Sequence, residues 1–155
     1  MNIQFVQGDI FLTRMQAILV GLNAAGRMNV TPFFTALQDQ YPVFISDYRK
    51  RVSAGKNAPG NVWVWRDNVH WMVGSIVQET PQSAARLRYV ETTLLNLYKR
   101  VEQEGLRSLA VYLPVEQPEW ATVQDLLNRY LPLFGLPVVV YETYQRHICA
   151  EPENS

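Results

Sequence analysis

Hydrophobic positions along the chain change between a period of two and a period of three to four residues, which predicts strands followed by helices. Polar and apolar residues alternate over Asn2–Val6, and Ala17–Leu22 is a nearly continuous apolar run. Both segments are predicted to be strands, the second buried on both faces. Two further runs rich in aromatic and β-branched residues, 61–65 and 69–73, flank Arg66-Asp67-Asn68 and indicate an antiparallel hairpin.

Four segments carry apolar residues at helical spacing and are predicted to be helices. The first is short and begins at Pro32 with Thr31 as its N-cap. The others cover Pro42–Ala54, Ser83–Glu104 and Trp120–Tyr130. Gly55 and Gly105 follow two of these helices as C-terminal stops, because glycine readily adopts the left-handed conformation that ends a helix.

The second half of the chain alternates strands and helices, which fixes the expected fold class. Arg107–Leu113 and Pro137–Tyr141 are predicted strands around the last helix, giving a β-α-β-α-β order that favours parallel pairing. We find no repeat, linker or low-complexity segment, so the sequence predicts a single α/β domain over residues 1–144. The composition turns polar after that point, and residues 145–155 are expected to form a flexible C-terminal tail.

Composition limits the possible functions. Apolar residues make up 48% of the chain, and 14 basic residues balance 14 acidic ones, so no net charge attracts nucleic acid or an anionic membrane over a distance. No apolar run approaches the ~20 residues that span a bilayer. Cys149 is the only cysteine, which excludes an internal disulfide. With no secretory leader in the first residues, we expect a cytoplasmic protein.

Several short motifs occur in an order and spacing that point to one family. They are Gly8-Asp9-Ile10, Gly55, Pro59-Gly60, Trp63-Val64-Trp65, Arg86-Leu87, the run Gly105–Ala110 and Glu119-Trp120. On these motifs, spread over about residues 3–142, the chain resembles a macro domain. It is most similar to the branch of terminal ADP-ribose protein glycohydrolases and of antitoxins that remove ADP-ribose from DNA. The resemblance implies a three-layer α/β/α domain with a mixed sheet, whose ligand lies across the carboxyl ends of the strands.

The resemblance also implies which residues bind the ligand. Asp9 corresponds to the acidic residue that accepts a hydrogen bond from the adenine amino group, and the backbone of Ile10 lies beside the ring. Without the resemblance, the residue pattern favours Asp9 as the cap of a turn or short helix. The first phosphate loop keeps only Gly26 of the expected glycines. Arg27 can supply positive charge there and Thr31 a hydroxyl, although Arg27 can also be an ordinary exposed loop residue.

Two departures from the family argue against ordinary ADP-ribose turnover. Pro114-Val115-Glu116-Gln117-Pro118 replaces the longer glycine-rich run expected for the second phosphate loop. Its two prolines lack N–H groups and Glu116 adds a negative charge, so a diphosphate would meet fewer donors and more repulsion there. Gln78 occupies the position of the nucleophilic lysine. An amide cannot form the covalent adduct, so we expect no lysine-dependent glycohydrolase activity and favour a protein that is not an enzyme.

One catalytic alternative stays open, with Glu119 as acid or base and Asn23 orienting a water molecule. The competing interpretations are that Glu119 caps a helix and that Asn23 bonds the backbone at a strand end. His70 is expected to be an exposed strand residue. No cluster of His, Cys and Asp has metal-ligand spacing, so neither a metal nor a cofactor is expected.

Three functions therefore remain. The first is binding of ADP-ribose or a related adenine nucleotide without turnover, and the second is an ADP-ribosyl hydrolase that uses Glu119 and Asn23. The third is an interaction scaffold that dimerises through Trp63 and Trp65, which share one strand face. The competing interpretation is that these two rings pack in the core. Nucleic acid is expected only as an ADP-ribosylated substrate.

Overall fold

The computed structural model describes residues 3–28, 30–115 and 119–151. Within these residues the chain forms a six-stranded sheet in the order β1-β6-β5-β2-β4-β3. The strands are β1 (Ile3–Gly8), β2 (Ala17–Asn23), β3 (Val62–Trp65), β4 (Trp71–Gln78), β5 (Leu109–Tyr112) and β6 (Val138–Tyr144). The helices are α1 (Pro32–Gln40), α2 (Pro42–Ser53), α3 (Leu87–Glu104) and α4 (Trp120–Tyr130), with 3₁₀ turns η1 (Ile10–Leu12) and η2 (Leu131–Phe134).

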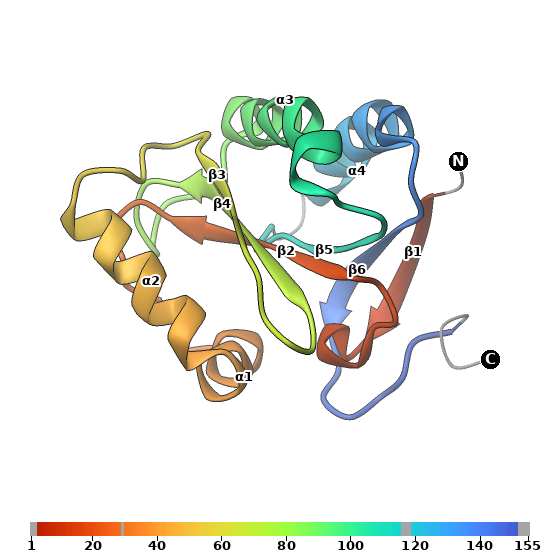
Figure 1. The fold of residues 1–155 in the computed structure, drawn as a ribbon, viewed down its shortest axis with the longest axis horizontal. Coiled ribbons are helices and arrows are strands. Elements are labelled where there is room, and N and C mark those ends of the chain that lie inside the picture. Colours follow the sequence, from red (N-terminus) through yellow and green to blue (C-terminus); the bar gives the residue numbers. More distant parts are fainter. Residues whose placement is uncertain (1–2, 29, 116–118, 152–155) are drawn as a thin grey trace.

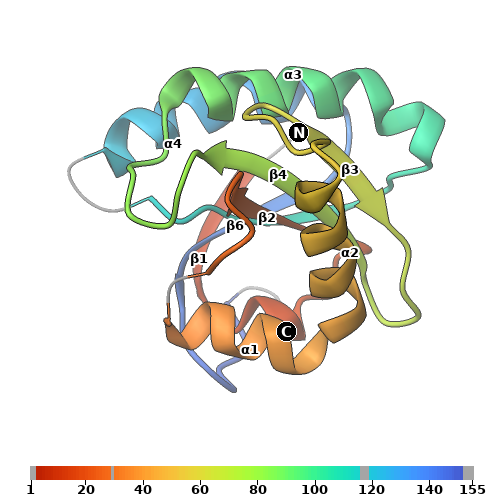
Figure 2. The same ribbon diagram turned by 90° about the vertical axis from the view of Figure 1, so that its left-hand side faces the viewer.

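Helices cover both faces of the sheet. Figures 1 and 2 show α3 and α4 on one face and α1 and α2 on the other. Each face has its own apolar core, one built around Phe33, Phe44 and Trp63 and the other around Leu94 and Leu127. The predicted three-layer α/β/α domain with a mixed sheet is therefore confirmed.

Parallel pairing around the central strand β2 brings the last residues of five strands to one edge of the sheet. All seven residues of β2 are buried, because β4 and β5 pair with it in parallel on either side and both helix layers cover it. β1, β6 and β5 are also parallel to one another, and only β3 runs antiparallel. Five strands thus end at the same edge, which we call the carboxyl edge. Their last residues are Gly8, Asn23, Gln78, Tyr112 and Tyr144.

Local signals placed most helix ends correctly. The Thr31 hydroxyl accepts a hydrogen bond from the Phe34 N–H at 3.1 Å, so Thr31 is the predicted N-cap of α1. Gly105 ends α3 with a φ of 80°. The predicted start of that helix at Ser83 was wrong, because Ser83 and Thr80 bond each other's backbone and side chain and hold residues 80–83 in a turn. The helix begins only at Leu87.

The tryptophan hairpin forms as predicted, with Trp63 in a core and Trp65 and Trp71 partly buried against the cores. β3 and β4 pair antiparallel, and the Trp63 ring lies over Gly74 on the neighbouring strand. Trp63 is 3% exposed and stacks near Tyr48 and Phe44. The core interpretation of Trp63 therefore holds, and this residue offers no surface for a second copy.

The expected exposure of His70 was wrong. The residue is 6% exposed, although it lies in the connection between two strands. Its Nδ1 lies 2.7 Å from the Tyr41 hydroxyl, and its Nε2 lies 2.9 Å from the carbonyl oxygen of Thr13. Both ring nitrogens thus have partners, and the imidazole joins the hairpin to the junction of α1 and α2 and to the segment after η1.

No helix in the described part of the chain combines the length and the apolar character that crossing a bilayer requires.

Candidate functional site at the carboxyl edge

Asp9 directly follows β1 and is 2% exposed. Its Oδ1 accepts a hydrogen bond from the Phe11 N–H at 3.0 Å, which makes Asp9 the N-cap of η1. Its Oδ2 accepts a second bond from the N–H of His147 at 2.9 Å. The capping role weighed for Asp9 is thus present, and the carboxylate lies at the predicted edge. Its contact with adenine stays a prediction.

Aromatic rings pack around Asp9 on the α1 side of the sheet. Ile10 is fully buried, and Phe11 stacks on Phe33 with ring centroids 5.6 Å apart. Phe33 also stacks on Tyr112 at 4.0 Å. Tyr144, which pairs with Gly8 in the sheet, meets both phenylalanine rings edge-on at 5.9 Å. The edge beside Asp9 is therefore apolar and aromatic, apart from the carboxylate and the tyrosine hydroxyls.

Asn23 ends β2 and organises the loop that follows it. Its Oδ1 accepts hydrogen bonds from the N–H groups of Ala25 at 3.0 Å and Gly26 at 3.1 Å, and its Nδ2 donates to the carbonyl of Arg27 at 2.5 Å. The Tyr48 hydroxyl donates to the Asn23 carbonyl at 2.5 Å and lies 3.2 Å from Oδ1. Burial, above all other effects, raises the pKa of Tyr48 to about 12, so this donor keeps its proton at neutral pH.

The backbone N–H groups that the resemblance assigns to a diphosphate already donate hydrogen bonds within the protein. The N–H of Ala24 donates to the Gln78 carbonyl at 2.9 Å, and those of Ala25 and Gly26 donate to Asn23. Gly26 has a φ of 78° and lies against Val52, which accounts for the glycine. Arg27 is exposed and brings positive charge, whereas the Thr31 hydroxyl is used as a helix cap.

Gln78 lies beside Asn23, because the two residues pair in register at the ends of β4 and β2. It is 8% exposed, and its Nε2 donates to the Ser83 carbonyl at 2.8 Å. The structure thus brings these two predicted residues together. Asp9 lies further along the edge: β6 and β5 intervene, and three strand spacings of about 4.8 Å put it roughly 14 Å from Asn23.

The remaining predicted residues belong to the connection between β5 and α4. The N–H of Val115 donates to the Leu113 carbonyl at 2.8 Å, so this donor is also used internally. Glu116 lies outside the described residues. Glu119 is exposed and precedes α4, where its carbonyl accepts bonds from the N–H groups of Thr122 and Val123 at 3.1 Å each. Its side chain makes no capping bond.

Comparison with solved structures decides the fold family. The chain superposes on the macrodomain of Thermus aquaticus DarG with a TM-score of 0.78 and 21% identity, covering 91% of this chain and 98% of that one. It superposes on Thermosipho africanus DarTG in complex with ADP-ribose with a TM-score of 0.80 and 21% identity, covering 96% and 43%. The chain has the macrodomain fold. The fold that the resemblance implied is thereby confirmed.

A sequence relative agrees with this macrodomain assignment. The DNA ADP-ribosyl transferase-DNA ADP-ribosyl glycohydrolase fusion protein of Thermosipho africanus is 23% identical over 168 residues, which cover 95% of this chain. The chain spans 43% of the length of that relative. No protein-family profile matches the chain.

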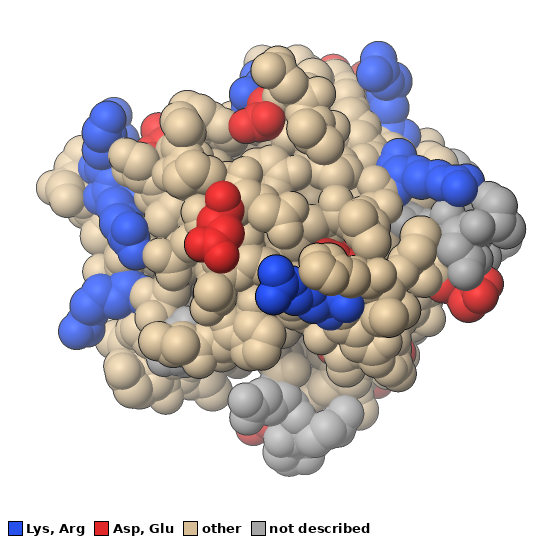
Figure 3. All heavy atoms as spheres, turned by 90° about the horizontal axis from the view of Figure 1, so that it is seen from below, with Lys and Arg blue, Asp and Glu red and all other residues tan. Residues whose placement is uncertain are grey.

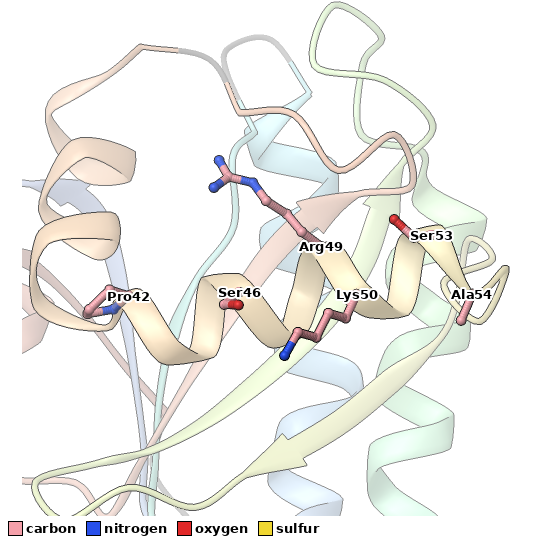
Figure 4. A pocket seen from close by; sticks show the side chains of 6 residues that line it. All are labelled: Pro42, Ser46, Arg49, Lys50, Ser53 and Ala54. Carbon is pink, nitrogen blue, oxygen red and sulfur yellow. The ribbon is translucent and has the colours of Figure 1, made fainter.

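Two hollows elsewhere on the protein are lined by none of the predicted site residues. One of about 580 Å³ lies along α2, where Arg49 and Lys50 point to different sides of the helix (Figure 4). Figure 3 shows basic side chains along the edge of the molecule that carries α2 and largely uncharged atoms across the face beside it. The described residues contain no group of three or more His, Cys, Asp or Glu side chains arranged to hold a metal.

A hollow of about 440 Å³ does lie near Asp9. It separates α1 from the segment after β6 and is lined by Thr31, Thr35, Asp39, Arg146 and His147, among others. No sequence pattern indicates His147 here, because its backbone N–H and not its side chain reaches Asp9. Tyr48 is buried on α2, and no sequence pattern indicates its bond to Asn23.

Proposed function

We propose that this protein binds ADP-ribose or a related adenine nucleotide along the carboxyl edge, with the adenine at Asp9, and does not hydrolyse it through a lysine adduct. The observation that carries the proposal is the placement of Asp9, Asn23 and Gln78 along one edge of a macrodomain sheet. Similarity to a DarTG structure that contains ADP-ribose supports the ligand class.

The chemistry of the adenine end favours a purine. A buried carboxylate at a strand end selects an exocyclic amine, because a charge-assisted hydrogen bond offsets its desolvation. Aromatic rings beside it suit a flat base. The carboxylate of Asp9 is buried next to Phe11 and Tyr144, so it combines both features.

The phosphate and ribose end favours weak binding without turnover. The N–H groups of residues 24–26 already have partners inside the protein, so a diphosphate relies more on the charge of Arg27. Gln78 lacks a nucleophilic amine. Both polar groups of the Asn23 side chain hold the loop, which leaves little capacity to orient a water for Glu119.

We extend the proposal to the setting of the protein. Cys149 is exposed and is the only cysteine, which suits a reducing compartment such as the cytoplasm. Nucleic acid enters only as the carrier of an ADP-ribose group.

Isothermal titration with ADP-ribose, AMP and NAD tests the proposal. We expect saturable heat with ADP-ribose, and an affinity about tenfold lower in Asp9→Asn, because asparagine still caps η1 but loses the charge that favours an amine. Asp125→Asn on the exposed side of α4, on the other face of the sheet, is the matched control and should bind like the wild type. Absence of heat with all three ligands would refute ligand binding. Release of ADP-ribose from a modified substrate, abolished in Glu119→Gln, would favour the hydrolase instead.

A further inference from the structure

The chain beyond β6 turns back against the end of β1. Figure 1 shows this segment, residues 145–151, running beneath the strand; we call it the C-terminal strap. The Gln145 N–H donates to the Gly8 carbonyl at 2.8 Å, and the Asp9 N–H donates to the Ile148 carbonyl at 2.7 Å. With the bond from His147 to the Asp9 carboxylate, the strap pairs with both the backbone and the side chain of Asp9.

His147 adopts an unusual conformation to make this contact. Its φ of 65° lies in the left-handed region, and it is the non-glycine residue with positive φ in the described part of the chain. L-residues pay for this conformation in backbone strain. The strain is balanced here by a hydrogen bond from an N–H to a buried carboxylate, the same kind of bond that a purine amine would make.

Burial within the strap is confined to Ala150. Ala150 is 1% exposed and packs on Gly8, where an added Cβ would come within 3.1 Å of the alanine methyl group. Residues 145–149 are all exposed. On its other side the strap borders the hollow of about 440 Å³ that separates it from α1. The part that covers Asp9 is thus attached mainly through backbone hydrogen bonds and has open space beside it.

The Tyr144 hydroxyl, near Asp9, is a buried polar group without a hydrogen-bond partner among the described residues. Burial, and then the charge of Asp9, raises the pKa of Tyr144, which places the hydroxyl in the electrostatic field of the carboxylate. A buried hydroxyl without a partner is costly, so it favours a ligand or a rearrangement that supplies one.

We propose that the C-terminal strap is an internal competitor for the adenine subsite, in which the His147 N–H occupies the Asp9 carboxylate until residues 145–149 move aside for the base. This inference rests on the proposed function, because it assumes that the base binds at Asp9. A ligand that binds only the open form has its apparent affinity reduced by the fraction of molecules that are open. The strap therefore sets how tightly the protein holds its nucleotide.

Two substitutions of one residue test the strap. In His147→Pro the ring removes the N–H that Asp9 accepts and fixes φ near −65°, so the strap cannot dock. In His147→Gly the N–H stays and positive φ carries no strain, so the strap docks more firmly. Neither change touches Ala150. By calorimetry we expect ADP-ribose and AMP to bind His147→Pro about tenfold more tightly than the wild type, and His147→Gly more weakly than the wild type.

The outcomes separate the strap from the function. Equal affinities in the wild type and the two His147 variants would refute the role proposed for the strap and leave the proposed function standing. No binding in any of them would overturn both. If His147→Pro does not fold, hydrogen exchange in the wild type decides. The Asp9 amide should exchange through local opening, faster than the Val20 amide in the central strand, and its exchange should change when ADP-ribose is added. Equal protection of the two amides without ligand would overturn the strap.

Discussion

Replacing Asn23 by alanine is expected to lower the free energy of unfolding by about 3 kcal/mol, because it removes three or four hydrogen bonds worth about 1 kcal/mol each. The N–H groups of Ala25 and Gly26 lose their acceptor, the carbonyl of Arg27 loses its donor and the Tyr48 hydroxyl loses its contact with Oδ1. Urea denaturation followed by circular dichroism measures the loss.

Asn61→Ala provides the matched control for this variant. Asn61 also donates through Nδ2 to a backbone carbonyl, that of Lys56, but it makes this bond near the surface. We expect its loss to cost about 1 kcal/mol or less. Similar losses in both variants would contradict the organising role assigned to Asn23.

Replacing Gly74 by alanine is expected to destabilise the protein by about 3 kcal/mol or more, the upper range for an overpacked core. A Cβ on Gly74 would lie 2.3 Å from the Trp63 ring, which cannot retreat because Tyr48 and Phe44 pack near it. The thermal unfolding midpoint should fall by several degrees. Gly55→Ala is the control, since its Cβ meets nothing within 4 Å and only the backbone strain of a φ of 70° opposes it.

A second substitution shows whether Trp63 causes the effect. In Trp63→Leu the smaller side chain leaves room for a methyl group on residue 74, so adding Gly74→Ala should cost far less than it does in the wild type. Additive losses from the two changes would mean that the clash lies elsewhere.

Periodicity predicted most of this fold, because each element obeys a local rule. The apolar run 17–22 became the fully buried β2, Thr31 became the cap of α1, and Trp120–Tyr130 matches α4. Errors arose where side-chain hydrogen bonds overrode the pattern, over a long separation in sequence at His70 and within one turn at Thr80–Ser83. His70 is buried because Tyr41 and Thr13 bond its ring, and the Thr80–Ser83 turn delays α3.

The candidate site was only partly visible in the sequence. The resemblance placed Asp9, Asn23 and Gln78, and the structure puts them on one edge. The resemblance did not indicate that the N–H groups of Ala25 and Gly26 already have an acceptor. That acceptor exists because the Asn23 side chain turns back toward the loop that follows it. The segment after residue 144 was expected to be a flexible tail from its polar composition. Its contacts with Gly8 and Asp9 are made through the backbone, which composition does not reveal.

The central claim is that an adenine nucleotide binds along the carboxyl edge. The most direct measurement is a titration of the ¹⁵N-labelled protein with ADP-ribose, followed through its amide resonances. The account predicts saturable shifts at residues 8–10, 23–27 and 77–78, and at 145–148 as the strap moves. Resonances at these positions that stay unchanged, or shifts confined to the tryptophan hairpin or to α2, would contradict it.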